Sequence, residues 1–244
     1  MAKHKSKPKP SLPARLIERM LTPVRWVWRW VLRAALIVAV IVSATVAVHA
    51  YLDPPRTLYM SQEASRLSGI DHQWVPIDEM AEAMPRSLVA AEDANFCLHW
   101  GFDMNAIRTA LEDGAGRGAS TLSQQVVKNV YLWHGRSWSR KALEALITPL
   151  VETFWSKQRI LEVYLNVAEF GEGVFGVEAA SRHYFGTGPE NLNEQQAGLL
   201  AAILPNPKER SASKPSNFVR KRARQVRDGA ATIRRDGRAA CFED

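Results

Sequence analysis

The stretch Ala-Glu-Asp-Ala-Asn-Phe-Cys-Leu-His-Trp-Gly at residues 91–101 contains side chains that could carry out acid–base chemistry. It places Glu92 where an apolar helix gives way to a turn, and the helix dipole disfavours a negative charge at that end. Asp93 adds like-charge repulsion, so both effects predict a raised pKa for Glu92. A raised pKa suits a general acid or base that works near neutral pH. The alternative is a polar helix terminus without a chemical role.

A second polar group follows at residues 118–125, with the sequence Gly-Ala-Ser-Thr-Leu-Ser-Gln-Gln. Thr121 followed by Gln124 is a capping-box pattern that begins a helix, and a helix N-terminus is a natural anion site. Gln124 and Lys128 are four residues apart and share a helical face. Taken alone, the segment is better interpreted as a well-capped surface helix. The candidate substrate-binding residues of this group are Ser120, Thr121, Gln124, Gln125 and Lys128.

Cations gather in the next segment at Arg136, Arg140 and Lys141, and Glu144 shares a helical face with the last two. Arginine offers bidentate contacts to phosphate oxygens and lysine a point charge, so this helix could clamp a diphosphate. The alternative is a local ion pair worth about 0.3–0.5 kcal/mol. Residues 53–207 are otherwise acidic, with 12 basic and 19 acidic side chains. A cationic cluster in such a domain favours the clamp.

Other polar residues near Glu92 are expected to hold structure. His99 has no second His or Cys at metal-ligand spacing, so no zinc site is predicted. It is interpreted as a residue that holds the loop, and Asp93 and Asp103 as residues that position backbone. Cys97 and Cys241 are the only cysteines. Two thiols so far apart predict no disulfide framework, and Cys97 is interpreted as a small apolar filler.

The net charge of +7 is unevenly distributed, which argues against a nucleic-acid partner. Residues 1–33 form a basic tail, whereas residues 53–244 hold 23 basic and 24 acidic side chains. Residues 34–52 carry no formal charge apart from a possible one on His49. Their length as a helix is about 28 Å, close to the ~30 Å of a bilayer's hydrocarbon core. The positive-inside rule predicts a single-pass anchor with a cytosolic N-terminus, and a cleaved signal peptide is the alternative.

The expected fold class is predominantly α, because strand-like alternation is scarce. The turn glycines Gly171, Gly173 and Gly176 are preceded by no predicted strand. Residues 53–78 are interpreted as a connector with little periodicity, and residues 79–244 as the catalytic domain. Ser139 is expected to cap a helix that Pro149 would kink. Helical patterns or caps predict helices in the ranges 85–92, 106–111, 121–131, 139–151, 156–165, 193–204 and 219–233.

These blocks resemble, in order and spacing, the signature motifs of the family 51 peptidoglycan glycosyltransferases. The motif Glu-Asp-x-x-Phe-x-x-His-x-Gly is complete at Glu92, Asp93, Phe96, His99 and Gly101. Residues 118–125 match Gly-x-Ser-Thr-x-x-Gln-Gln, and residues 140–144 match Arg-Lys-x-x-Glu. Residues 157–166, which end at Asn166, match the fourth motif, and residues 173–184 resemble the fifth.

The resemblance implies a lysozyme-like helical domain with a smaller membrane-associated lobe after one transmembrane helix. Its substrates would be lipid II and the growing glycan. Glu92 would take the proton of the acceptor's 4-hydroxyl as the anomeric carbon is inverted. Lys128, Arg136, Arg140 and Lys141 would stabilise the leaving diphosphate, and Glu144 would orient these cations or the acceptor. Asp93, Phe96, His99, Gly101 and Asn166 would be structural.

The resemblance further implies the bacterial inner membrane as the location, with the catalytic domain in the periplasm. It requires no cofactor, although a divalent cation could assist the diphosphate. Cell-wall synthesis or division proteins are conceivable partners. Ser211 and Lys214 match Ser-x-x-Lys, but only 30 residues follow and Lys-Thr-Gly is absent, so no transpeptidase domain is expected.

Two rival functions remain open from the sequence. A lytic transglycosylase or lysozyme-type hydrolase also uses a helix-end glutamate on a helical fold, but it needs no diphosphate clamp. A non-catalytic, membrane-anchored scaffold for cell-wall enzymes would not need Glu92 at all. Removal of the Lys128 and Arg140 charges distinguishes the first rival, and replacement of Glu92 distinguishes the second.

Overall fold

The computed structural model describes residues 12–112, 120–135 and 137–243. The chain divides into two compact units, Met1–Thr45 and Val46–Asp244. The first unit consists of most of helix α1 (Leu12–His49), in which Pro23–His49 is apolar and long enough to cross a membrane. The predicted single apolar helix is confirmed. It extends well before residue 34, because the Arg, Leu and Trp residues of 24–33 continue the helix without a breaker.

The segment predicted as a connector belongs instead to the folded second unit. It contains helix α2 (Leu58–Leu67), strand β1 (Asp71–His72) and the short 3-10 helix η1 (Ile77–Glu79). Thr57 caps α2, and Met60 is fully buried. Val75 exchanges two backbone hydrogen bonds with the side chain of Asn166, at 2.9 and 2.8 Å. Strand β1 and helix η1 have two and three residues and are fixed by tertiary contacts, so local periodicity could not predict them.

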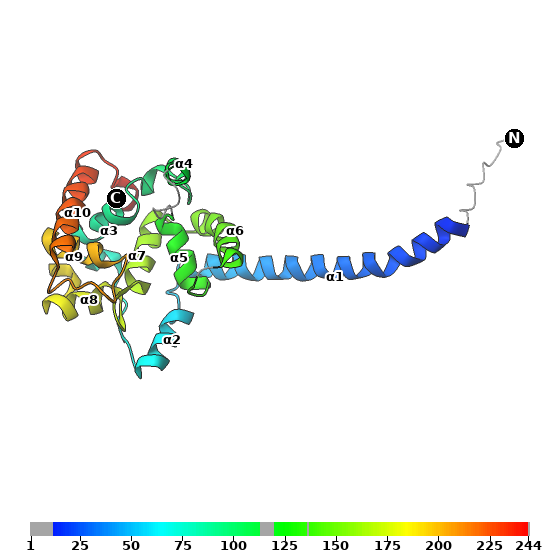
Figure 1. Cartoon of the computed structure of the whole chain (residues 1–244), viewed down its shortest axis with the longest axis horizontal. Coiled ribbons are helices and arrows are strands. Elements are labelled where there is room, and N and C mark those ends of the chain that lie inside the picture. Colours follow the sequence, from blue (N-terminus) through cyan, green and yellow to red (C-terminus); the bar gives the residue numbers. More distant parts are fainter. Residues whose placement is uncertain (1–11, 113–119, 136, 244) are drawn as a thin grey trace. The chain divides into compact units, whose positions relative to one another are not determined.

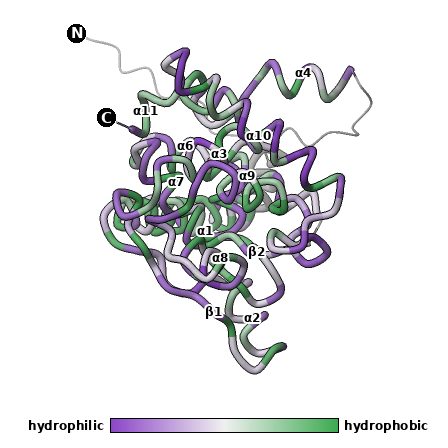
Figure 2. Tube along the Cα trace, turned by 90° about the vertical axis from the view of Figure 1, so that its left-hand side faces the viewer, coloured by the Kyte–Doolittle hydropathy of each residue, from purple (hydrophilic) through white to green (hydrophobic). Residues whose placement is uncertain are grey.

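Two groups of helices build the core of the second unit (Figure 1). Helix α3 (Ala83–Glu92) packs with α9 (Glu194–Ile203) and α10 (Asn217–Arg235). Helix α5 (Leu122–Tyr131) packs with α6 (Trp138–Phe154) and α7 (Lys157–Val167). Apolar and hydrophilic stretches alternate along these helices (Figure 2), as expected where one face is buried. The predominantly α fold class is confirmed.

Shorter elements complete this unit. They are the 3-10 helices η2 (Phe96–Leu98) and η3 (Pro189–Asn191), and the helices α4 (Met104–Glu112), α8 (Gly176–Phe185) and α11 (Ala240–Glu243). Strand β3 (Val174–Phe175) pairs in parallel with β1 and antiparallel with β2 (Glu169–Gly171). Strand β2 therefore does precede the turn glycines, contrary to the prediction. Strands this short show no alternation that a sequence pattern could reveal.

Helix caps agree with the sequence in most places. The capping boxes at Thr121–Gln124 and Asn193–Gln196 are present, and Ser156 caps α7. The prediction was wrong for α6, because the hydroxyl of Ser137, not that of Ser139, accepts from the backbone of Arg140. Helix α6 continues through Pro149 to Phe154. The predicted end of α4 at the glycines of 114–118 lies outside the described residues.

The interpretation of the cysteines was also wrong. Cys97 and Cys241 form a disulfide whose Cα atoms lie 5.7 Å apart, across 144 positions of sequence. Cys97 is thus a cross-link between η2 and α11 and no apolar filler. The pairing could not be predicted from sequence, because α10 must first bring the chain back to the segment that follows Glu92.

Candidate active site

Glu92 is the last residue of α3, and its environment is set by α5 and α7. Gln125 Nε2 donates a hydrogen bond of 3.0 Å to Glu92 Oε2. The hydroxyl of Tyr164, on α7, donates at 3.1 Å to Gln125 Oε1. The tyrosine therefore fixes which end of the Gln125 amide faces the carboxylate. This relay presents a donor to Glu92 and holds the carboxyl in one orientation.

The pKa of Glu92 is raised above its ordinary value, as predicted, but chiefly for a different reason. Burial is the largest cause, because it disfavours the charged form. The hydrogen bond from Gln125 and the positive charges of Arg222 and Lys128 oppose this effect, and repulsion from Asp93 adds only weakly to it. A half-buried carboxyl with a raised pKa and nearby cations can accept a proton near neutral pH.

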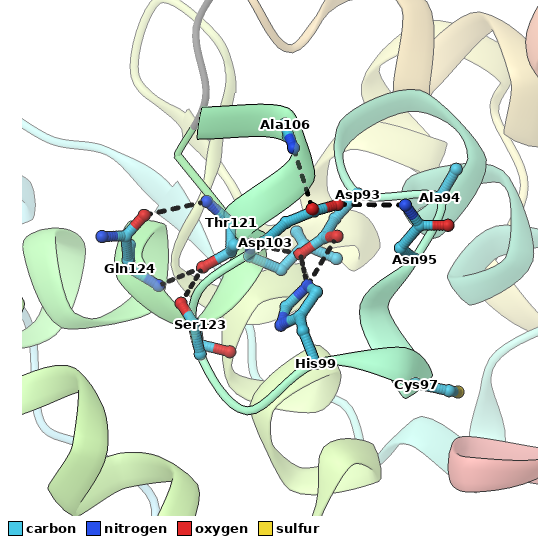
Figure 3. A network of polar contacts seen from close by, with 12 residues as sticks. Asp93, Ala94, Asn95, Cys97, His99, Asp103, Ala106, Thr121, Ser123 and Gln124 are labelled. Atoms are coloured by element: carbon cyan, nitrogen blue, oxygen red, sulfur yellow. Dashed lines mark hydrogen bonds and ion pairs between the residues drawn. The ribbon is translucent and has the colours of Figure 1, made fainter. Parts of the chain in front are cut away.

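Asp93 and His99 join the end of α3 to the start of α5 (Figure 3). Asp93 Oδ2 accepts from the backbone N–H of Leu122 at 3.0 Å, and Oδ1 accepts from His99 Nε2 at 2.9 Å. Asp103 accepts from the N–H groups of Asn105 and Ala106, at 3.0 and 2.9 Å, at the start of α4. All three side chains thus have the positioning contacts that the sequence suggested.

Thr121 and Gln124 are occupied within the protein rather than open to substrate. Gln124 Oε1 accepts from the backbone N–H of Thr121 at 3.1 Å, and the Thr121 hydroxyl donates to the carbonyl of Gly101 at 2.7 Å. Both side chains are buried. Gln124 therefore does not share a substrate-facing surface with Lys128. Gln125 is the glutamine of this motif that reaches Glu92.

The remaining motif residues support the loop after Glu92. Gly101 has φ of +80°, and a Cβ there would lie 2.7 Å from Cγ2 of Thr148. Lys157 Nζ donates to the carbonyl of His99 and to Glu152 Oε1, both at 2.9 Å, and lies 4.4 Å from the centre of the Phe96 ring. These contacts require a glycine at 101 and a cation at 157.

The predicted cation cluster forms around a buried carboxylate. Glu144 is 3% exposed and accepts from Arg140 Nη1 at 2.8 Å and from Lys141 Nζ. Lys141 Nζ also donates to the hydroxyl of Ser120 at 3.0 Å. Burial lowers the pKa of Lys128, opposed by the charge of Glu144. Arg136 lies outside the described residues.

The charges of Glu92 and the cluster meet around Lys128. The charge of its ammonium group interacts electrostatically with Glu92 and also with Glu144, Arg140 and Lys141. A groove of about 310 Å³ runs past Lys128, Gln125 and Tyr164. Glu92 and Ser120 line a second hollow, of about 120 Å³, and Gln125 of the groove donates its hydrogen bond to Glu92. The structure therefore brings the candidate base and the candidate clamp into one neighbourhood of the second unit.

Several lining residues of the groove were missed by the sequence analysis. They are Tyr59, His134, Glu169 and Lys208. Tyr59 stacks on His134 with ring centres 3.7 Å apart and donates to Glu169 Oε2 at 2.6 Å. Burial, followed by the charge of Lys128, lowers the pKa of His134 to about 4, so its imidazole is neutral at pH 7. Tyr59 lies in the segment that was interpreted as a connector, so it was not considered as a candidate site residue.

Comparison with known proteins fits this geometry. The Transglycosylase family model matches residues 60–231, a range that begins within α2. This chain belongs to the transglycosylase family. It is 61% identical over 197 residues to a biosynthetic peptidoglycan transglycosylase of Jannaschia sp. (strain CCS1), covering 81% of this chain and 82% of that protein.

Further transglycosylase relatives carry the same name. One from Caulobacter vibrioides is 46% identical over 200 residues, covering 80% of this chain and 87% of that protein. One from Ectopseudomonas mendocina is 50% identical over 187 residues, covering 72% and 77%. The four complete signature motifs and the segment that resembles the fifth all lie within the range matched by the family model. Within the described residues, His, Cys, Asp and Glu side chains do not gather in groups of three or more that could hold a metal ion.

Proposed function

We propose that this transglycosylase polymerises the glycan strands of peptidoglycan. It transfers the growing glycan from its lipid diphosphate to the 4-hydroxyl of lipid II, with inversion, and releases polyprenyl diphosphate. The observation that carries the proposal is that the charge of Lys128 acts both on the half-buried Glu92 and on a cation cluster, Arg140 and Lys141, that the buried Glu144 holds together. The names of the relatives, biosynthetic peptidoglycan transglycosylases, support the same substrate class.

In this reaction Glu92 is the general base. The acceptor oxygen forms a bond to the anomeric carbon, the bond from that carbon to the diphosphate oxygen breaks, and the hydroxyl proton passes to Glu92. A raised pKa keeps the carboxylate basic enough to take that proton near neutral pH. Gln125 holds the carboxyl in place through its own bond to Tyr164.

Lys128, Arg140 and Lys141 stabilise the negative charge that develops on the leaving diphosphate. Such preorganised charges act most strongly where water is partly excluded. Glu144 keeps Arg140 and Lys141 oriented and prevents their mutual repulsion from splaying them apart. Arg136 is assigned to the same task from the sequence alone. A divalent cation bound to the diphosphate would add to this neutralisation.

The anchor and the disulfide support a location at the outer face of the inner membrane. The basic residues at positions 1–33 favour a cytosolic N-terminus, and the second unit would then lie in the periplasm. The Cys97–Cys241 bond fits an oxidising compartment of this kind. On α6, the side chains of Trp138 and Leu146 are 91% and 70% exposed, which fits a membrane-associated lobe. Cell-wall synthesis or division proteins are proposed as further partners.

The test is incubation of the purified full chain in detergent with labelled lipid II. Wild type is expected to form long glycan strands, and Glu92→Gln to lose about 10²-fold or more in rate. Glu79→Gln, which changes an exposed carboxyl in η1, is the matched control and should retain wild-type activity. Absence of strands with wild type, or full activity of Glu92→Gln, would contradict the proposal.

The same assay separates the rival activities. Lys128→Ala and Arg140→Ala are expected to slow strand formation strongly, because only the synthetic reaction expels a diphosphate. A lytic enzyme would instead cleave polymeric glycan, and it would do so equally well with both variants. If the protein were a non-catalytic scaffold, the Glu92→Gln variant would restore growth of cells that lack the protein as well as wild type does.

A further inference from the structure

Helix α10 lies against the helix that carries Glu92. Its buried stripe consists of Val219, Ala223, Val226, Ala230 and Ile233, the same positions that the sequence pattern predicted. The contact with α3 is close, because a Cβ at Gly229 would lie 3.3 Å from Cβ of Ala90. The basic residues of α10 belong to none of the family's signature motifs.

One of these basic residues, Arg222, reaches the end of α3. Its Nη2 donates to the carbonyl oxygen of Ala91 at 2.9 Å, and the arginine is partly buried there. Ala91 immediately precedes Glu92, in the last turn of α3, where carbonyl groups lack partners within the helix. A cation at this position also opposes the negative end of the helix dipole.

The charges that face Glu92 come from every element packed against it. Asp93 follows it in the chain, Lys128 lies on α5 and Arg222 on α10, and the neutral phenol of Tyr164 lies on α7. Among the charged neighbours, Arg222 lowers the pKa of Glu92 most, ahead of Lys128. The cation with the strongest influence on the base is therefore absent from the family's motifs.

We propose that Arg222 is a positioning residue for Glu92. It holds the last turn of α3 through the carbonyl of Ala91 and offsets the negative end of the helix beside the base. The inference rests on the proposed role of Glu92. Loss of the Arg222 charge leaves burial and Asp93 less opposed, so the pKa of Glu92 rises further. Because the base acts ionised, activity is then lost at low pH and recovered as the pH rises.

The experiment compares Arg222→Gln with Arg222→Lys in the full chain. Arg224→Gln is the matched control, because Arg224 lines a groove with Gln195 and Leu199 on a different face of α10. For Arg222→Gln, the ratio of variant to wild-type kcat/KM on lipid II is expected to rise by at least about threefold from about pH 6 to about pH 8.5. Arg222→Lys keeps the charge and should keep the wild-type pH profile, with a uniform loss from the weakened carbonyl contact.

A second measurement does not depend on activity. Carbon-13 NMR of glutamate-labelled protein, with the Glu92 signal assigned through Glu92→Gln, follows the titration of this carboxyl directly. Its midpoint is expected to move to higher pH in Arg222→Gln and to stay in place in Arg224→Gln. An unchanged midpoint, or an equal loss of rate at every pH, would overturn the proposal even if lipid II is the substrate. If the titration midpoint of Glu92 shifts in Arg222→Gln but wild type forms no glycan strands from lipid II, the positioning role of Arg222 is supported and the proposed function is refuted.

Discussion

Lys157 connects the segment after Glu92 to the core through a single ammonium group. Besides its bond to the carbonyl of His99, it pairs with Glu152, whose side chain is only 2% exposed. Glu152 also accepts from the hydroxyl of Ser123 on α5. A carboxylate in such a place is tolerated because its cation is present, so the two residues stabilise the fold as a pair.

Lys157→Met is expected to lower the free energy of unfolding by about 3–5 kcal/mol, because it leaves the Glu152 carboxylate buried and unpaired. The double variant Lys157→Met with Glu152→Gln removes both charges and should cost clearly less than the single lysine change. Urea denaturation of the full chain in detergent, followed by circular dichroism, measures both. If the double variant loses as much free energy of unfolding as Lys157→Met alone, or more, the two charges are not coupled.

At the scale of residues, the sequence identified Glu92 and the direction of its pKa, but not the burial that dominates the shift. It assigned both glutamines of the second motif to substrate. The capping box that it recognised at Thr121 already indicated that Gln124 is used by the helix start. Arg222 could not be found in this way, because 130 positions separate it from Glu92 and only the packing of α10 on α3 brings it there.

The start of α5 is the element on which the site depends most directly. The Thr121 hydroxyl accepts from the backbone of Gln124 and donates to the carbonyl of Gly101, while Asp93 receives the N–H of Leu122. These bonds fix α5 to the loop after Glu92. Because Gln125 and Lys128 lie on α5, the orientation of this helix places both beside the base.

Thr121→Ala is expected to destabilise the protein by about 2 kcal/mol, because it removes a cap and leaves the carbonyl of Gly101 without its buried donor. Thr121→Ser keeps the hydroxyl and is the matched control, with a cost of well under half as much. Thermal and urea unfolding of the two variants gives the comparison. Similar losses for both would mean that the methyl group, and not the hydroxyl, stabilises this helix start.

At the scale of elements, helices with a side-chain cap and an apolar stripe could be predicted from sequence. Helices α5, α7, α9 and α10 begin or end within a few residues of their expected limits. Helices α2, α8 and α11 and the three strands were missed. The strands have only two or three residues each and depend on distant partners, as where His72 of β1 contacts the carbonyl of Asn166. Their stability comes from tertiary contacts, which no local window of sequence contains.

At the scale of the whole molecule, the C-terminal segment contacts the loop after Glu92. The contacting residues lie beyond residue 231, where the match to the family model ends. Arg238 Nη1 donates to the carbonyl of Ala94 at 2.9 Å, and Cys241 is bonded to Cys97. Glu243 pairs with Arg86 on α3. These contacts tie the C-terminal segment to α3 and to the residues directly after it.

Reduction of the Cys97–Cys241 bond is expected to lower the free energy of unfolding by about 2–5 kcal/mol, because the bond closes a long loop. Thermal unfolding of wild type with and without dithiothreitol measures the effect. The double variant Cys97→Ser with Cys241→Ser should unfold near the temperature of the reduced wild type and should not respond to dithiothreitol. An unchanged midpoint after complete reduction, verified by thiol labelling, would contradict this expectation.

The cross-link has a consequence for biogenesis. It joins Cys97 to a cysteine that is synthesised 144 positions later, so the covalent ring encloses most of the second unit. With the proposed periplasmic location, a polypeptide that stalls in the export channel before Cys241 emerges leaves Cys97 without the partner that closes the ring. Translocation of Cys241 and covalent closure of the loop beside Glu92 would thereby be coupled, and copies that stop before Cys241 would lack the cross-link.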